Sequence, residues 1–290
     1  MAKNKIIFLI QCEDKKGILA KISSFFYAQG FNILSCQQFT DTIQNRYFMR
    51  VSLDAIDLKQ ERADLENRFA KIADELNSKW AVHYTEDIIN IGIMVSKTSH
   101  CLFDLLEKQS EGKLNCNIPL IISNYPDIEY VAKQFKIPFH HVPIKDENKI
   151  REQEDQILRL LKKNNVDLVV LARYMRILSP DFIKEYPEKI INIHHAFLPA
   201  FKGAKPYERA YERGVKMIGA TAHYTTDKLD EGPIIEQDVE SVSHVNTPEK
   251  LTGIGADIER KVLSKAVKSH LENRIIVTGN RTIVFPETNE

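Results

Sequence analysis

The chain lacks the features that tie a protein to nucleic acids, membranes or an oxidising compartment. Its 40 basic residues balance 40 acidic ones without a block of like charge, which argues against nucleic-acid binding. No apolar run approaches the ~18 residues of a membrane span, and the run at residues 6–10 is too short for a signal peptide. The four cysteines form no Cys-x-x-Cys pair, which disfavours a zinc knuckle or a disulfide framework. The sequence predicts a soluble, cytoplasmic protein that binds neither nucleic acid nor membrane.

The length of 290 residues, with 43% hydrophobic residues, is enough for two compact units. The pattern changes near residue 85, so we expect one domain at 1–84 and a second at 85–290. The first has the order strand, helix, strand, strand, helix, strand of a split βαβ unit. Strands are expected at residues 6–10, 33–39, 46–53 and 80–84, with a helix that starts near Ile18 and ends at Gly30 and another at 59–76.

From residue 88 onward strands alternate with helices, which predicts a mostly parallel sheet covered on both faces. The fold class is α/β, with an N-terminal ferredoxin-like α+β domain followed by a Rossmann-like domain. In such sheets ligands bind at the carboxyl ends of the strands. Strands are expected at 88–95, 118–123, 139–142, 166–171, 189–194, 217–225 and 234–239, helices at 147–164 and 248–271, and a terminal hairpin at 275–285.

Asn192, His194 and Asp230 are the candidate catalytic residues. Alternation along the strand at 189–194 places Asn192 and His194 on one face, near its carboxyl end. An amide or imidazole buried without a partner costs roughly 2–7 kcal/mol, and Asp230 on the tight loop 229–233 can supply one. Each residue alone also fits a structural role. Together, a donor amide, a titratable imidazole and an orienting carboxylate are the groups needed to move a one-carbon acyl group.

Three motifs in a fixed order carry a family resemblance. They are Asn-Ile-His-His-Ala-Phe-Leu-Pro-Ala-Phe at 192–201, Gly-Ala-Thr-Ala-His-Tyr at 219–224 and Leu-Asp-Glu-Gly-Pro-Ile-Ile at 229–235. This combination resembles the formyltransferase-fold family. With an ACT-like unit in front, the resemblance to the deformylases of that family covers nearly the whole chain. It implies that Asn192, His194 and Asp230 form the catalytic triad and that 10-formyltetrahydrofolate is hydrolysed to formate and tetrahydrofolate, without a metal or other cofactor. It also implies a part in purine synthesis and one-carbon balance.

The resemblance further implies ligand-binding residues in both units. Asp14, Gly17 and Asn32 fall where ACT domains bind a free amino acid, methionine or glycine, between paired subunits of an even-numbered homo-oligomer. A turn and a helix start explain Asp14 and Gly17 equally well. A segment after a predicted parallel strand would hold the folate, although a strand-to-helix connection with a solvated arginine pair is the alternative. The implied folate-binding residues are Arg173, Tyr174, Met175, Arg176, Ile177 and Leu178, together with His223, which also fits a hydrogen-bonded strand residue.

Adjacent histidines give a further expectation. Strand alternation predicts that the rings of His194 and His195 point apart, as do those of His140 and His141, which argues against a metal site. His195 then packs on the second face of its strand. Ala196 stands where the resemblance leads us to expect a serine, so no hydroxyl can act there.

The nucleophile decides between related activities. Glycinamide ribonucleotide transformylase has a glycine-rich turn that cradles the phosphate of its acceptor, whereas the turn at 95–101 here is Val-Ser-Lys-Thr-Ser-His-Cys. Methionyl-tRNA formyltransferase would need a basic RNA-binding unit, and none is visible. Water is therefore the simplest nucleophile. Formyl transfer to a small amine acceptor is the alternative, and a non-catalytic folate and amino-acid sensor is a third possibility.

Overall fold

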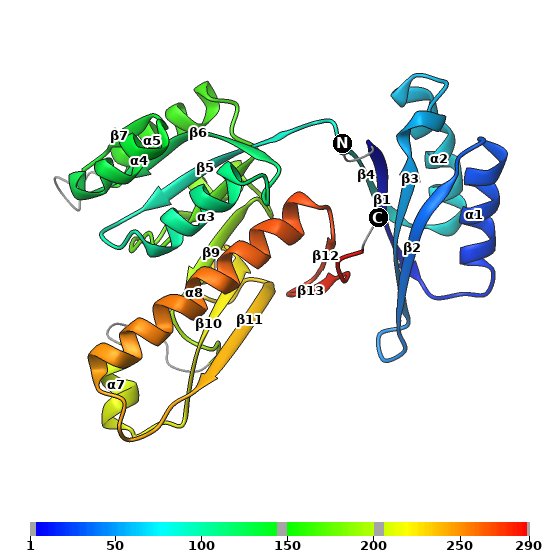
Figure 1. Ribbon diagram of the computed structural model, residues 1–290. Coiled ribbons are helices and arrows are strands. Elements are labelled where there is room, and N and C mark those ends of the chain that lie inside the picture. The colour runs from blue at the N-terminus through cyan, green and yellow to red at the C-terminus, as the bar shows by residue number, and fades with distance from the viewer. Residues whose placement is uncertain (1–3, 144–149, 200–205, 289–290) are drawn as a thin grey trace. The chain divides into compact units, whose positions relative to one another are not determined.

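The computed structural model describes residues 4–143, 150–199 and 206–288. The chain divides into two compact units. The first comprises residues 1–88, 272–276 and 283–290, and the second comprises 89–271 and 277–282. Each is described by itself (Figure 1). Among the described helices, none is both long and apolar enough to cross a membrane.

The first unit is an antiparallel sheet of four strands in the order β2-β3-β1-β4, with two helices on one face (Figure 1). This arrangement confirms the predicted order of elements, and all four strands extend further than expected. The elements are β1 (Lys5–Glu13), α1 (Ile18–Ala28), β2 (Ile33–Asp41), β3 (Arg46–Asp54), the short η1 (Ala55–Asp57), α2 (Arg62–Leu76) and β4 (Lys79–Tyr84).

Alternation along β1 gives this sheet two apolar faces. Phe8 faces the helices, and its ring centroid lies 5.0 Å from that of Phe26 and 4.7 Å from that of Phe69. On the opposite face, Ile7 packs in a separate cluster with residues of the C-terminal segment, including Phe285. The prediction gave all of 85–290 to the second domain. The contacts instead place 272–276 and 283–290 with the first. Ile276 and Phe285 from these segments cover a sheet face that would otherwise be exposed.

The second unit contains a sheet of seven strands in the order β11-β10-β9-β8-β5-β6-β7. The five strands β9, β8, β5, β6 and β7 pair in parallel. Strand β10 pairs antiparallel with both β9 and β11. The strands are β5 (Ile89–Val95), β6 (Cys116–Ser123), β7 (Phe139–His141), β8 (Leu168–Leu171), β9 (Ile190–His194), β10 (Met217–Tyr224) and β11 (Ile234–Ser241). The α/β fold class is thus confirmed, with a ferredoxin-like unit in front.

Helices pack against this sheet. Ile157 and Leu161 of α5 belong to the same apolar cluster as Met94 and Val169 of the sheet. The long helix α8, orange in Figure 1, packs against α3, β9, β10 and β11. The predicted start of α5 at residue 147 lies outside the described residues. The helices are α3 (His100–Ser110), η2 (Pro126–Ile128), α4 (Glu129–Phe135), α5 (Ile150–Lys163), α6 (Pro180–Glu185), α7 (Pro206–Glu212) and α8 (Pro248–Leu271). The predicted hairpin forms from β12 (Ile275–Thr278) and β13 (Arg281–Val284).

Candidate active site

The carboxyl end of β9 carries the candidate catalytic residues. Asn192 pairs in register with Leu171 of β8 on one side and with His223 of β10 on the other, so it lies inside the sheet and not at an edge. Asp230 comes from the loop between β10 and β11 and has a φ of 55°, a left-handed conformation that is uncommon outside glycine. Gly232 allows this loop to approach β10, because a Cβ there would overlap the carbonyl oxygen of Tyr224. The fold therefore fixes both sides of the site.

His194 and Asp230 form a buried pair. The Nδ1 atom of His194 lies 3.2 Å from Oδ1 of Asp230, and the two side chains are 7% and 11% exposed. A carboxylate only accepts hydrogen bonds, so Nδ1 carries the hydrogen and the lone pair of a neutral ring is on Nε2. That Nε2 atom is buried and has no hydrogen-bond partner in the described part of the chain. The pair thus presents one unused basic nitrogen.

Burial alone would raise the pKa of Asp230. The hydrogen bond and charge of His194, with a smaller contribution from His223, instead hold the pKa of this carboxyl below its usual value. Asp230 is therefore ionised at neutral pH and stabilises a positive charge on His194. This is the electrostatic arrangement required of an orienting carboxylate.

His223 connects Asn192 to the same carboxylate. Its Nδ1 atom lies 2.9 Å from the carbonyl oxygen of Tyr224, so Nδ1 must donate and Nε2 must accept. The amide nitrogen of Asn192 lies 3.2 Å from that Nε2, and Oδ1 of Asp230 lies 3.8 Å from it. Burial lowers the pKa of His223, which keeps the ring neutral. Both ring nitrogens contact groups of the protein, so His223 orients Asn192. Folate binding by His223 stays a prediction.

The rings of His194 and His195 are stacked, with centroids 5.1 Å apart and planes inclined by 22°. The predicted divergence of these rings was wrong because β9 ends at His194, and alternation does not extend beyond the end of a strand. His195 is buried and stacks on the ring of His194. Burial, followed by the charges of Arg173 and His194, lowers the pKa of His195 to about 4.

The predicted folate segment follows β8 and is tied to the ends of two other strands. Ser96 donates its backbone N–H to the carbonyl of Arg173, and its Oγ accepts from the N–H of Met175 at 3.0 Å while donating to Asn124 at 2.8 Å. The segment thus has a defined backbone at the carboxyl edge of the sheet. Tyr174 and Leu178 are buried in the core, Met175 and Ile177 are 57% and 69% exposed, and Arg176 is half-buried.

Arg173 belongs to a buried cluster that the sequence did not reveal. Glu259 of α8 is 1% exposed and accepts hydrogen bonds from His100 at 2.8 Å and from the hydroxyl of Tyr207 at 2.6 Å. The Nε atom of Arg173 lies 3.4 Å from the same carboxylate. Burial would raise the pKa of Glu259, but His100, Arg173 and Tyr207 together hold it below its usual value. The one available signal was the position of Glu259 on the apolar face of α8, beside Gly255, Ile258 and Val262.

His100, Cys101 and Glu259 could in principle hold a metal, since their ligand atoms lie within 4.8 Å of one another. The guanidinium of Arg173 already lies beside this carboxylate, and burial raises the pKa of the Cys101 thiol well above its usual value. A cation would have to compete with a fixed positive charge. That no metal takes part stays a prediction.

The predicted effector residues lie on turns of the first unit. Gly17 precedes α1 with a φ of 88°, and no atom lies near the position that a Cβ would take. The backbone N–H of Asp14 donates to the carbonyl of Asn45, and that of Asn32 donates to a carboxylate oxygen of Asp57 at 2.9 Å. Effector binding by these residues stays a prediction.

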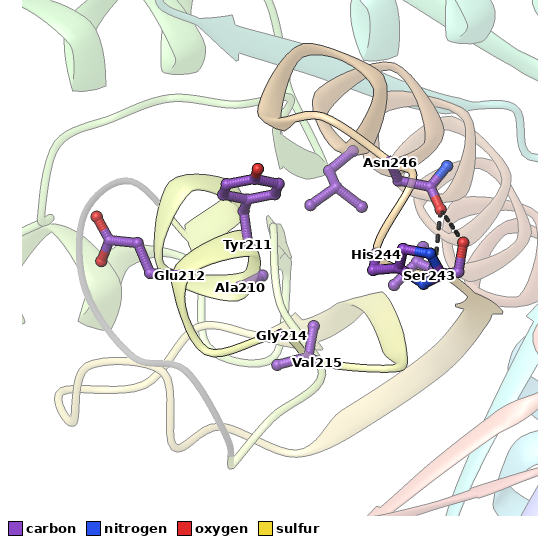
Figure 2. Close-up of a pocket in the computed structure, with 10 residues that line it drawn as sticks. Ala210, Tyr211, Glu212, Gly214, Val215, Ser243, His244 and Asn246 are labelled. Carbon is purple, nitrogen blue, oxygen red and sulfur yellow. Dashed lines mark hydrogen bonds between the residues drawn. The ribbon is translucent and has the colours of Figure 1, made fainter.

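A separate cavity of about 300 Å³ lies between α7 and the start of α8 (Figure 2). Tyr211, Val215 and His244 line it, and Asn246 accepts two hydrogen bonds from Ser243 at its rim. None of the predicted catalytic or folate-binding residues borders this cavity. It is therefore distinct from the arrangement around His194.

Comparison with known proteins identifies the two units. The ACT domain family matches residues 6–70, and the formyl transferase family matches residues 89–267. A formyltetrahydrofolate deformylase of Synechocystis sp. is 48% identical over 277 residues, which is 96% of this chain and 97% of that protein. The Escherichia coli K12 formyltetrahydrofolate deformylase is 44% identical, covering 94% of this chain and 96% of that one.

Solved structures agree with these matches. The crystal structure of a formyltetrahydrofolate deformylase from Pseudomonas syringae pv. tomato superposes with a TM-score of 0.95 at 39% identity, covering 99% of this chain and 96% of that one. A glycinamide ribonucleotide transformylase from Symbiobacterium toebii superposes with a TM-score of 0.67 at 28% identity, covering 70% of this chain and 97% of that one. The chain belongs to the formyltetrahydrofolate deformylase family, with an N-terminal ACT domain and a formyltransferase domain.

Proposed function

We propose that the chain hydrolyses 10-formyltetrahydrofolate to formate and tetrahydrofolate, with Asn192, His194 and Asp230 as its catalytic residues. Membership of the deformylase family supports the reaction. One observation carries the assignment of residues: His194 is buried against Asp230 through Nδ1 and keeps its Nε2 without a partner at the carboxyl end of a central strand. A buried nitrogen without a partner costs stability, and a substrate that uses it explains why it is retained.

The geometry of the pair suggests how water attacks. Nε2 of neutral His194 takes a proton from water while the water oxygen forms a bond to the formyl carbon. The carbonyl electrons then move onto oxygen, giving a tetrahedral oxyanion. The imidazolium and the amide of Asn192 donate hydrogen bonds to that oxygen, and the loss of one such donor typically costs about 2.7–4 kcal/mol of transition-state stabilisation. Asn192 has one N–H left for this purpose, because the other is directed at His223.

Collapse of the intermediate completes the reaction. The bond between carbon and N10 of the folate breaks, the proton held by His194 moves to N10, and the released formic acid ionises. Ionised Asp230 stabilises the imidazolium between these two proton transfers. The residues of the chain thus balance every proton without a metal or cofactor, and we propose that none takes part.

Release of formate in the absence of an acceptor tests the reaction. Pure protein incubated with 10-formyltetrahydrofolate alone is expected to yield formate and tetrahydrofolate in equal amounts. The alternative, transfer to a small amine, is favoured by the similarity of the second unit to glycinamide ribonucleotide transformylases. No formate from the folate alone, with tetrahydrofolate and a formylated amine appearing once an amine acceptor is added, would overturn the hydrolase proposal in favour of this alternative.

Regulation by an amino acid is the further proposal for the first unit. The match to the ACT domain family supports a small-molecule effector, and we propose methionine as activator and glycine as inhibitor, bound at Asp14, Gly17 and Asn32 within an even-numbered homo-oligomer. The enzyme would act in the cytoplasm and supply formate for purine synthesis. Formate release measured with and without each amino acid tests the effector. An unchanged rate with both would contradict it.

A further inference from the structure

The segment that follows β8, residues 173–179, contains no helix or strand and is anchored at both ends by buried carboxylates. At its start, Nε of Arg173 lies 3.4 Å from Glu259. At its end, Glu154 accepts a hydrogen bond from the backbone N–H of Ser179 at 2.8 Å and another from its hydroxyl. Arg173 also has a φ of 64°, in the left-handed region that side chains rarely adopt. Groups outside the segment therefore set its course.

The segment leaves the sheet beside the candidate catalytic strand. Leu171, the last residue of β8, pairs in parallel with Asn192 of β9, so the chain enters the segment at the sheet edge where Asn192 lies. Met175 and Ile177 of the segment are 57% and 69% exposed. Binding sites for flat ring systems are lined mainly by apolar side chains. The position and the exposed side chains thus suit the predicted folate-binding role.

Ser96, the first residue after β5, connects this segment to the ends of two other strands. It is 1% exposed, and its Oγ accepts a hydrogen bond from the backbone N–H of Met175 at 3.0 Å. Its own backbone N–H donates to the carbonyl of Arg173 at 3.2 Å. A hydroxyl has a single hydrogen, and that of Ser96 is directed at Oδ1 of Asn124, just beyond β6, at 2.8 Å. One buried serine thereby joins residues that follow β5, β6 and β8.

We infer that Ser96 is a positioning residue that, with Asn124 as its acceptor, holds the backbone of residues 173–178 in the conformation that binds folate. The inference rests on the proposed function and on the predicted folate segment. Without the hydroxyl, the N–H of Met175 loses its acceptor, so conformations in which this N–H turns to water become populated. Folate then binds only the fraction of molecules that keep the segment in place, and the apparent affinity falls by that fraction.

The contacts of Ser96 predict an effect on substrate binding and not on the chemical step. Its Oγ and N–H reach Met175 and Arg173, and within the described residues none of its hydrogen bonds reaches a candidate catalytic residue. Loss of the hydroxyl should therefore raise KM and leave kcat near its original value. A purely structural role would instead reduce the amount of folded enzyme and leave KM unchanged.

Ser96→Ala in the full-length chain is the test, and Ser123→Ala is its matched control. Ser123 is also a buried serine at a strand end, and its hydroxyl donates to the carbonyl of Ser96 and accepts from the N–H of Tyr125. Neither contact involves residues 173–178. Ser96→Ala is expected to raise KM for 10-formyltetrahydrofolate roughly tenfold with kcat within about twofold, whereas Ser123→Ala keeps KM within about twofold. The Kd for tetrahydrofolate, measured by calorimetry without turnover, should weaken by the same factor as KM rises.

Variants of Asn124 test the acceptor of the hydroxyl. Asn124→Asp keeps an oxygen for Ser96 and is expected to keep the original KM. Asn124→Leu removes that oxygen, leaves the hydroxyl without a fixed orientation, and is expected to raise KM roughly threefold to tenfold. The double variant of Ser96→Ala with Asn124→Leu should bind no more weakly than Ser96→Ala alone, because both changes act through the same hydroxyl.

Two results would overturn the inference. One is a KM and Kd in Ser96→Ala that match those of Ser123→Ala, and the other is a fall in kcat at unchanged KM. Additive effects of the Ser96 and Asn124 substitutions would contradict the shared contact in the same way. If the unaltered protein released no formate, the proposed hydrolysis would fail, and the Kd for tetrahydrofolate would still decide the role of Ser96.

Discussion

Two buried carboxylates in the second unit, Asp230 and Glu259, each contact a histidine, but they differ in how many of the surrounding polar groups are paired. Asp230 is on a loop and contacts His194 through one ring nitrogen, and the other ring nitrogen stays without a partner. Glu259 is on a long helix and is saturated by His100, Tyr207 and Arg173. Both have a pKa below the usual value despite burial. The pKa direction is the same for both carboxylates, so the unused nitrogen of His194 is the observation on which we propose a catalytic role for Asp230 and a structural one for Glu259.

The largest expected effect is on turnover at the Asp230 pair. Asp230→Asn and His194→Ala should each lower kcat by roughly 10²–10⁴-fold, because a positioned proton-transfer group contributes about that much. The free energy of unfolding should change far less. Steady-state kinetics of formate release and urea unfolding measure the two. A rate within about threefold of the unaltered protein in either variant would contradict the assignment.

The opposite pattern is expected at Glu259. Glu259→Leu leaves the guanidinium of Arg173 buried without its partner, and breaking a buried ion pair in this way typically costs about 3–5 kcal/mol of stability. Urea unfolding at neutral pH measures the loss. Glu66→Leu on α2 is the control, since Glu66 accepts a single hydrogen bond from Tyr84 in the first unit. Equal losses in the two variants would show that the Glu259 cluster is no anchor.

Substitutions at two glycines, one near Asp230 and one near Glu259, test the same difference between the two carboxylates and should have smaller effects. A Cβ at Gly232 would overlap the carbonyl oxygen of Tyr224 and displace the Asp230 loop, whereas a Cβ at Gly255 would overlap the ring and hydroxyl of Tyr207 beside Glu259. Such overpacking costs about 1–3 kcal/mol. Gly232→Ala should therefore lower kcat more than stability, and Gly255→Ala should lower stability more than kcat. Gly253→Ala on the same helix meets no atom and controls for helix propensity. The reverse pattern would contradict the division of roles.

The smallest expected effect is on acid stability. A carboxyl whose pKa is lower in the folded state contributes stability that is present above its unfolded pKa of about 4 and lost as pH falls through the folded value. Both Asp230 and Glu259 meet this condition. Asp230→Asn should thus flatten the dependence of unfolding free energy on pH below about 4 without changing its slope near pH 7. An unchanged acid slope would show that the His194 contact does not stabilise the ionised form.

The local patterns of the sequence predicted the elements and the central pair. Strand alternation placed Asn192 and His194 on one face near the carboxyl end of the same strand, and the loop at 229–233 brings Asp230 to His194. The stacking of His195 escaped prediction because it depends on where β9 ends, which alternation does not specify. The sequence did not predict that the C-terminal segments belong to the first unit. Ile276 and Phe285 pack on an apolar face of its sheet, and the pattern of a short hairpin does not indicate which sheet it will cover.

The Glu259 cluster was not predicted from the sequence for a different reason. Its members come from α3, the end of β8, α7 and α8, and no local period links residues so far apart in sequence. The helical pattern of α8 does place an acid on the buried face, and a buried acid requires partners. That signal predicts that partners exist without saying which residues they are. The left-handed conformation of Arg173 likewise emerges only from the backbone.

The most direct measurement is the fate of water oxygen during turnover. Pure protein is incubated with 10-formyltetrahydrofolate in water labelled with a heavy oxygen isotope, and the formate is analysed by mass spectrometry. Attack by water at the His194 and Asp230 pair predicts one labelled oxygen in each formate, formed at a rate that Asp230→Asn lowers by at least about 100-fold. Formate without label, or labelled formate produced as fast by Asp230→Asn, would contradict hydrolysis at this site.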